Sequence, residues 1–281
     1  MLSYTLNDGT TTPWVAFGTG TALYKKDAAE AVRVAIENGV THLDGAQMYE
    51  NEDSLGAGIK ASGKSRSELY VTTKLKGLAE GQTIKDTLVI SLKKLDLEYV
   101  DLFLIHDPTS AKGQLKAWWK QMEEVKKEGL TRSIGVSNFR VQDLEEVLEV
   151  ATIVPAVNQI EFHPYVYEAA KPIYKFSQEH KILVASYGGL APIVRAPGGP
   201  LDPVVGAIAD RLQISPGQVY TKWLIQKGIL VVTTSSKAAR IIETLKTPDV
   251  TDLTSEDIAA IEEAGGKLHK RIFMRHAFGE A

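Results

Sequence analysis

Short apolar runs rich in β-branched residues alternate along the chain with longer amphipathic stretches. The runs predict strands at Trp14–Phe17, Thr41–Leu43, Leu69–Thr73, Val100–Ile105, Thr131–Val136, Ala156–Gln159, Leu183–Ser186 and Leu230–Thr233. Between them, apolar positions recur at helical spacing. This spacing predicts helices at Asp27–Asn38, Thr83–Leu95, Gln114–Lys127, Val141–Val150 and Glu168–His180.

Residues with strong positional preferences mark several helix ends. Gly39 follows the first predicted helix, where glycine commonly ends a helix. Ser215-Pro216 predicts a helix start, with serine as the cap and proline in the first turn. Thr254–Asp257 resembles a capping box, which predicts an extra C-terminal helix.

The repeated strand–helix order predicts an α/β fold with a parallel sheet covered by helices. The chain has 281 residues, close to the ~250 typical of a (β/α)8 TIM barrel, so we expect residues 1–281 to form one barrel domain. Ser3–Asp8 and Thr11–Pro13 are expected to form an N-terminal β-hairpin across one end. The Gly/Pro-rich segment Gly188–Pro200 is expected to be the longest loop.

A doubly wound open sheet is the alternative architecture. Gly18-Thr19-Gly20 begins like a dinucleotide-binding glycine motif, but Leu23 stands where that motif needs its third glycine. The number of strand–helix units favours the closed barrel.

Composition narrows the possible partners. The net charge is -3, so no strong basic field favours nucleic acid or an anionic membrane. The chain has no cysteine, which excludes disulfides and thiolate metal sites. We find no secretory signal and no apolar run long enough for a membrane span, so a cytoplasmic protein is expected.

Polar residues follow the predicted strands one after another. Chemistry in a TIM barrel takes place at the C-terminal ends of its strands, so these groups are expected to meet on one rim. They are Asp44, Lys74, His106, Ser137, Asn138, Gln159, Tyr187 and Ser235. The alternative interpretation is that polar residues simply mark where loops begin.

Asp44 and Lys74 could form a partly buried ion pair on this rim, within reach of Tyr49. A nearby cation lowers the pKa of a phenol, which would help Tyr49 to donate a proton near neutral pH. His106 could orient a carbonyl oxygen or share its proton. No side chain of this set supplies a hydride, so the hypothesis requires a cofactor. Lys74 at a strand end is also compatible with a Schiff-base barrel aldolase.

Five sequence blocks resemble the aldo-keto reductase family. They are His42–Tyr49, Thr72-Thr73-Lys74, Asp101–His106, Ile134–Phe139 and Asn158–Tyr165. The resemblance covers nearly the whole chain and implies a TIM-barrel reductase of ketones or aldehydes with NADPH as cofactor. It also implies no metal and, as the family default, a monomer.

The resemblance implies a catalytic tetrad of Asp44, Tyr49, Lys74 and His106. Tyr49 would be the general acid, Lys74 paired with Asp44 would lower its pKa, and His106 would orient the carbonyl. Hydride would pass directly from the nicotinamide to the carbonyl carbon. A regulatory subunit that binds NADPH without catalysis is the alternative within the family.

The resemblance also implies a cofactor site. Ser137, Asn138 and Gln159 would hold the nicotinamide carboxamide, and Tyr187 would stack on the ring. Lys237 and Arg240 could clamp a 2′-phosphate, which would favour NADPH over NADH. The alternative interpretation is that they are solvated side chains at the start of a helix. Further expected cofactor-binding residues are Thr19, Asp44, Gly188, Leu190, Ser235 and Ser236.

Three positions depart from the common family pattern around the substrate. Gly20 and Asp107 stand where tryptophan is frequent, and Lys76 stands where an aromatic residue is common. These changes suggest a pocket for polar or bulky dicarbonyls; alternatively, Lys76 and Asp107 face solvent or pair with each other. Thr233–Lys237 is similar to fungal reductases of conjugated polyketones and ketopantoyl lactone. Whether the tail after Gly265 covers the pocket is left open.

Overall fold

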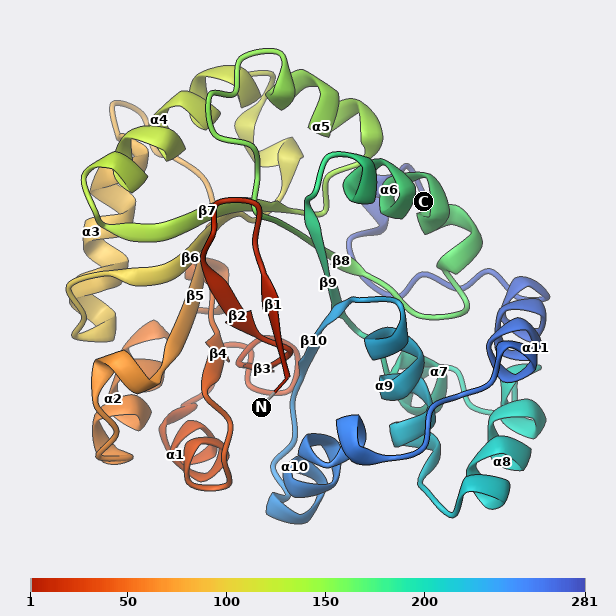
Figure 1. The fold of residues 1–281 in the computed structure, drawn as a ribbon. Coiled ribbons are helices and arrows are strands. Elements are labelled where there is room, and N and C mark those ends of the chain that lie inside the picture. Colours follow the sequence, from red (N-terminus) through yellow and green to blue (C-terminus); the bar gives the residue numbers. More distant parts are fainter. Residues whose placement is uncertain (1, 281) are drawn as a thin grey trace.

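The computed structural model describes residues 2–280, which form a closed parallel barrel surrounded by helices (Figure 1). The strands pair in the order β10-β3-β4-β5-β6-β7-β8-β9, so the last strand closes on the first, with Val231 opposite Val15. The barrel strands are β3 (Val15–Gly18), β4 (His42–Asp44), β5 (Tyr70–Leu75), β6 (Val100–Ile105), β7 (Thr131–Ser137), β8 (Val157–Glu161), β9 (Leu183–Tyr187) and β10 (Leu230–Thr233). The predicted barrel is confirmed, and the open sheet is wrong.

The predicted N-terminal hairpin is also present. Strands β1 (Ser3–Thr5) and β2 (Thr11–Pro13) pair antiparallel and cross one end of the barrel in Figure 1. The Asp8 carboxylate at the hairpin turn pairs with Lys126 and accepts from Ser133, which ties the turn to the barrel wall. The hairpin therefore covers the end at which the strands begin.

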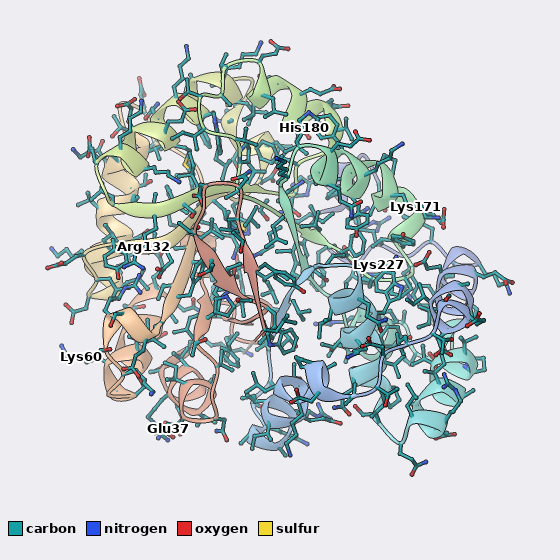
Figure 2. All side chains as sticks on the ribbon, in the orientation of Figure 1. Glu37, Lys60, Arg132, Lys171, His180 and Lys227 are labelled. Carbon is teal, nitrogen blue, oxygen red and sulfur yellow. The ribbon has the colours of Figure 1, made fainter. Side chains whose placement is uncertain are left out.

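Helices surround the barrel, and their charged side chains such as Glu37, Lys60 and Lys171 project outward (Figure 2). They are α1 (Ala29–Glu37), α2 (Glu52–Ala61), α3 (Ile84–Leu95), α4 (Leu115–Lys127), α5 (Val141–Leu148), α6 (Tyr167–Glu179), α7 (Ala191–Arg195), α8 (Leu201–Leu212), α9 (Pro216–Gln226), α10 (Ala238–Leu245) and α11 (Ser255–Gly266). None of the helices within residues 2–280 combines the length and hydropathy needed to cross a bilayer.

The expected helix caps are formed. Thr254 and Asp257 exchange side-chain to backbone hydrogen bonds at the start of α11, as do Ser215 and Gln218 at the start of α9. Gly39 has a φ of 100°, a left-handed conformation that glycine adopts without strain. One expectation was wrong: Gly188–Pro200 is not a plain loop, because it contains the short helix α7.

Alternation along the strands divides the core. Leu102 and Leu104 of β6 pack with Ala16, Ala185 and Leu230 inside the barrel. Their neighbours Phe103 and Ile105 pack outward against the surrounding helices. Because both faces of every barrel strand are covered, the polar groups that follow the strands lie at a rim with a rigid base.

Candidate active site

Three consecutive strands bring a carboxylate, an ammonium and an imidazole together. Asp44 ends β4, Lys74 lies near the end of β5, and His106 follows β6. Lys74 Nζ donates to Asp44 Oδ1 at 2.5 Å and to the Gly45 carbonyl at 2.9 Å. Lys74 and Asp44 are 0% and 2% exposed, so their charges face each other out of water.

Tyr49 completes this group. It lies in a single 3-10 turn, Gln47–Tyr49, that follows β4. Lys74 Nζ donates to the Tyr49 hydroxyl at 3.4 Å, and the ring of Tyr49 meets that of His106 edge-on with centroids 5.5 Å apart. The four residues proposed from the sequence as a tetrad are therefore brought together.

Burial dominates the electrostatics of the phenol. It raises the pKa of Tyr49 above its ordinary value of 10, Lys74 lowers that pKa in part, and Asp44 raises it. Lys74 thus acts in the expected direction, but burial, which the sequence did not reveal, outweighs it and the net pKa of Tyr49 is raised. Tyr49 is a protonated donor at neutral pH.

The two neighbouring residues differ in charge near pH 7, because His106 is neutral and Lys74 is a cation. Burial, aided by the charge of Lys74, lowers the pKa of His106 to about 3, so the imidazole is neutral near pH 7. Its Nδ1 atom is buried and has no hydrogen-bond partner within residues 2–280. Burial lowers the pKa of Lys74, but Asp44 and Tyr49 together raise it above its ordinary value. Lys74 therefore remains a cation.

The expected carboxamide-binding residues lie beside this group. Gln159 Nε2 donates to Asp44 Oδ2 at 2.8 Å, and Ser137 Oγ donates to the Gln159 carbonyl at 2.7 Å. Asn138 donates to the His106 carbonyl at 2.9 Å and accepts from the Tyr187 hydroxyl at 2.6 Å. These amide and hydroxyl groups offer the donors and acceptors that a carboxamide requires.

The remaining predicted cofactor residues are divided between two parts of the rim. Thr19 is buried, and its hydroxyl donates to the Asp44 carbonyl at 3.3 Å. Gly188 and Leu190 lie between β9 and α7. Ser235, Ser236, Lys237 and Arg240 lie beyond β10 at the start of α10.

Lys237 and Arg240 are exposed, and no described acidic side chain pairs with either of them. Ser235 Oγ accepts from the Lys237 amide at 3.1 Å, which orders the turn that precedes α10. Two unpaired cations beside a helix start suit a phosphate.

The three departures around the substrate have different surroundings. A Cβ atom at Gly20 would lie 2.9 Å from Tyr49 Cζ, so the glycine leaves room for the phenol ring. Lys76 is half exposed, and its Nζ atom lies 3.6 Å from Glu50 Oε1. Asp107 is only 4% exposed, and its Oδ2 atom lies 3.0 Å from His276 Nε2. Lys76 and Asp107 do not pair with each other.

The sequence interpretation missed residues that support the rim. Asn51 is buried and donates to the carbonyls of Thr19 and Leu23, which ties the loop after β3 to the Tyr49 turn. Glu161 is also buried and accepts from the backbone of Ile272 and Phe273. Asn51 closely follows Tyr49, and Glu161 lies within a recognised block, but neither position indicates its partner.

Comparisons with known proteins identify the family of this chain. The family model "Aldo/keto reductase family" matches residues 13–265. A "NAD/NADP-dependent indole-3-acetaldehyde reductase" of Schizosaccharomyces pombe is 40% identical, with 94% of this chain and 95% of the relative covered. A "NADPH-dependent alpha-keto amide reductase" of Saccharomyces cerevisiae is 35% identical, with 93% and 90% covered.

A solved structure is similar over almost the full length. The Bombyx mori aldo-keto reductase in complex with NADP superposes with a TM-score of 0.87 at 34% identity, covering 98% of this chain and 96% of that one. The family model matches most of the chain, and both curated relatives exceed 30% identity. The chain belongs to the Aldo/keto reductase family.

Proposed function

We propose that this chain reduces a ketone or aldehyde to an alcohol with NADPH, with Tyr49 as the general acid. The observation that carries the proposal is the position of Lys74 Nζ, 2.5 Å from Asp44 Oδ1 and 3.4 Å from the Tyr49 hydroxyl. The cation stabilises the phenolate that forms when Tyr49 gives up its proton. Asp44 in turn keeps the buried lysine charged.

The chain's own residues hold the carbonyl and move one proton. The substrate oxygen accepts a hydrogen bond from the Tyr49 hydroxyl, and the neutral His106 beside it orients that oxygen. As the carbonyl carbon becomes reduced, the phenol proton passes to the oxygen and leaves phenolate next to Lys74. NADPH, when bound, supplies the hydride from carbon 4 of its nicotinamide.

The residues fit that cofactor at both of its ends. Ser137, Asn138 and Gln159 provide polar groups for the carboxamide. Lys237 and Arg240, which are exposed and pair with no acidic side chain among residues 2–280, provide charge for a 2′-phosphate. Thr19, Gly188, Leu190, Ser235 and Ser236 are assigned to the same site. A cofactor with a 2′-phosphate is thereby preferred to NADH.

The two alternatives are disfavoured by physical arguments. A Schiff-base lysine must reach its neutral form, but the pKa of Lys74 is raised and its ammonium is paired with Asp44. A regulatory subunit has no need for an assembled proton donor such as the Tyr49–Lys74 pair.

For the substrate, we propose dicarbonyls and keto lactones or esters, as in the fungal subgroup that the Thr233–Lys237 segment resembles. The relatives' names include an aldehyde and an α-keto amide as substrates. Gly20 leaves its space to the Tyr49 ring instead of an aromatic wall, and Asp107 and Lys76 place polar groups where aromatic side chains are common. The smaller number of aromatic contacts suits a polar carbonyl compound.

The test is the absorbance loss of NADPH, and in parallel of NADH, with ketopantoyl lactone, isatin and benzaldehyde. Turnover with NADPH and little with NADH is expected, with benzaldehyde the slowest substrate. A clear preference for benzaldehyde contradicts the substrate proposal. NADPH binding without turnover of any carbonyl would instead favour the regulatory subunit.

The 2′-phosphate clamp has its own test. Replacing Lys237 and Arg240 together by alanine should raise the Kd of NADPH by about 10- to 100-fold, since two charge-assisted contacts are lost. The Kd of NADH should change by less than about twofold, because NADH lacks the phosphate. Equal weakening of both cofactors contradicts the clamp.

A further inference from the structure

The chain returns to the rim after α11. The Lys270 amide donates to the Tyr165 carbonyl at 3.1 Å, and the next residues run past the end of β8. There the Ile272 amide donates to Glu161 Oε1 at 2.9 Å, and the Phe273 amide donates to Glu161 Oε2 at 2.8 Å. One side chain at the end of a barrel strand thus holds two consecutive peptide groups of the C-terminal segment.

The Glu161 carboxylate needs these partners. It is 0% exposed, and its other described hydrogen-bond partner is His163 Nε2 at 2.9 Å. Burying a carboxylate costs free energy unless its oxygens accept hydrogen bonds. The amides of the C-terminal segment also need acceptors, so the carboxylate and the segment both favour the docked position. The segment is therefore fixed at this point of the rim.

Docking brings Phe273 against Tyr187. Glu161 and Tyr187 are register partners on β8 and β9, so the segment that Glu161 holds lies near the tyrosine. The Phe273 ring meets the Tyr187 ring edge-on with centroids 5.9 Å apart and an interplanar angle of 71°. It also lies against Gly188, whose Cβ position would be 3.4 Å from Phe273 Cε2.

Tyr187 is consequently held from two directions. Its hydroxyl donates to Asn138 Oδ1 at 2.6 Å, and its ring edge contacts Phe273. Burial, followed by the charge of Glu161, raises the pKa of Tyr187 well above 10, so it stays a hydroxyl donor. With both contacts made, the ring has little freedom to rotate.

We propose that Phe273 and Glu161 are positioning residues for the nicotinamide: they hold the C-terminal segment against Tyr187 and fix the ring face on which the nicotinamide packs. This inference rests on the proposed function, because it takes NADPH as the cofactor and Tyr187 as the side chain on which its nicotinamide stacks. The C-terminal segment then tunes cofactor binding through Tyr187 without touching the 2′-phosphate end.

The experiment compares two probes on the full-length chain. NADPH engages the whole site, whereas 2′,5′-ADP carries the 2′-phosphate but no nicotinamide. Phe273→Ala should raise the Kd of NADPH about fivefold through the lost aromatic contact and change the fluorescence of bound NADPH. The Kd of 2′,5′-ADP should stay within about twofold. Phe273→Tyr should restore NADPH binding.

Phe278→Ala is the matched control, because Phe278 lies in the same segment but packs on Arg271, with Arg271 Cζ 3.9 Å from the ring centroid. This variant should bind both probes like the wild type. Glu161→Gln should raise the Kd of NADPH but not that of 2′,5′-ADP, as Phe273→Ala does. If Glu161→Gln does not fold, the Phe273 variants alone test the inference.

Three outcomes overturn the inference: unchanged NADPH binding in Phe273→Ala, equal weakening of both probes, or the same loss in Phe278→Ala. Wild-type protein that binds neither probe contradicts the proposed function itself and removes the basis of the inference. The two failures are therefore distinguishable.

Discussion

Two carboxylates are buried at opposite ends of the barrel, and each is 2% exposed and paired with a cation. Asp44, where β4 ends, pairs with Lys74 at 2.5 Å. Asp101, near the start of β6, pairs with Arg66 at 2.6 Å and with Arg132 at 3.4 Å. The two ends use the same kind of interaction for different purposes.

The difference lies in what the cation contacts besides its carboxylate. Arg66 donates to the backbone carbonyls of Leu69 and Tyr99, and its guanidinium stacks on the Tyr99 ring at 4.1 Å. Lys74 also donates to one backbone carbonyl, that of Gly45, but in addition it directs its ammonium to the hydroxyl of Tyr49. The planar guanidinium of Arg66 fixes loops at the end of the barrel where the strands begin. The compact ammonium of Lys74 faces a phenol at the end where the strands finish. We therefore expect the first pair to govern stability and the second to govern chemistry.

The largest expected effect is at Tyr49. Tyr49→Phe should reduce kcat by about 10²- to 10⁴-fold, because the proton donor is removed while the ring remains. The Kd of NADPH and the free energy of unfolding should change little. Steady-state kinetics, fluorescence titration and urea denaturation measure the three quantities. Wild-type turnover in this variant would show that the rim end has no special role.

Asp101→Asn should have the opposite profile. Removing the carboxylate leaves Arg66 without its buried partner, which should lower the free energy of unfolding by about 3 kcal/mol. Well below the melting temperature, kcat/KM should stay within about twofold, because Asp101 lies far from the proton donor. Urea denaturation followed by kinetics at low temperature checks both. A large fall in kcat of the folded variant would contradict the division between the two ends.

A smaller effect is expected at Gly20. Its added Cβ would lie 2.9 Å from Tyr49 Cζ, so Gly20→Ala must shift the ring. A displaced proton donor should lower kcat by about tenfold. Gly206→Ala is the control, since nothing lies within 4 Å of a Cβ at Gly206 in α8. Equal activity of the two variants would show that the Tyr49 ring moves aside at no cost.

The smallest effect is expected from pH. Tyr49 must be protonated to donate, and its pKa is raised above 10, so the donor form persists across neutral pH and is lost only as pH rises through that value. His106, with a pKa of about 3, stays neutral over the same range. Reduction should vary less than about twofold between about pH 6 and 8. A kinetic limb near pH 6.5 that disappears in His106→Asn would contradict this.

The sequence predicted the barrel because apolar strands are recognisable runs, and it predicted Asp44, Lys74 and His106 because each comes at or just after the end of a strand. It did not predict α2, in which Gly56 and Gly58 weaken the helical pattern. A Cβ at Gly56 would lie 2.4 Å from the Leu95 carbonyl oxygen, so close packing against the end of α3 explains that glycine.

Sequence patterns could not predict the long-range contacts that position the residues at the rim. Glu161 and Phe273 are 112 positions apart, and no local signal links them. The pKa of Tyr49 depends on the balance between burial and a nearby charge, and only three-dimensional packing decides that balance. Residue types and their order along the strands therefore identified the candidate catalytic residues. Tertiary contacts determined the partners of these residues and the sign of the pKa shift of Tyr49.

The seam between β10 and β3 has a consequence for synthesis of the protein. Thr234 Oγ1 donates to the Gly18 carbonyl at 2.6 Å across a separation of 216 residues. At about 5 to 20 residues per second, a ribosome needs roughly 10 to 40 s to make that interval. Throughout this time one edge of β3 has unpaired backbone N–H and C=O groups, which can pair with strands of other chains. The last barrel strand to be translated therefore protects the first, and the proposed cofactor residues after each of them meet only when most of the polypeptide has emerged.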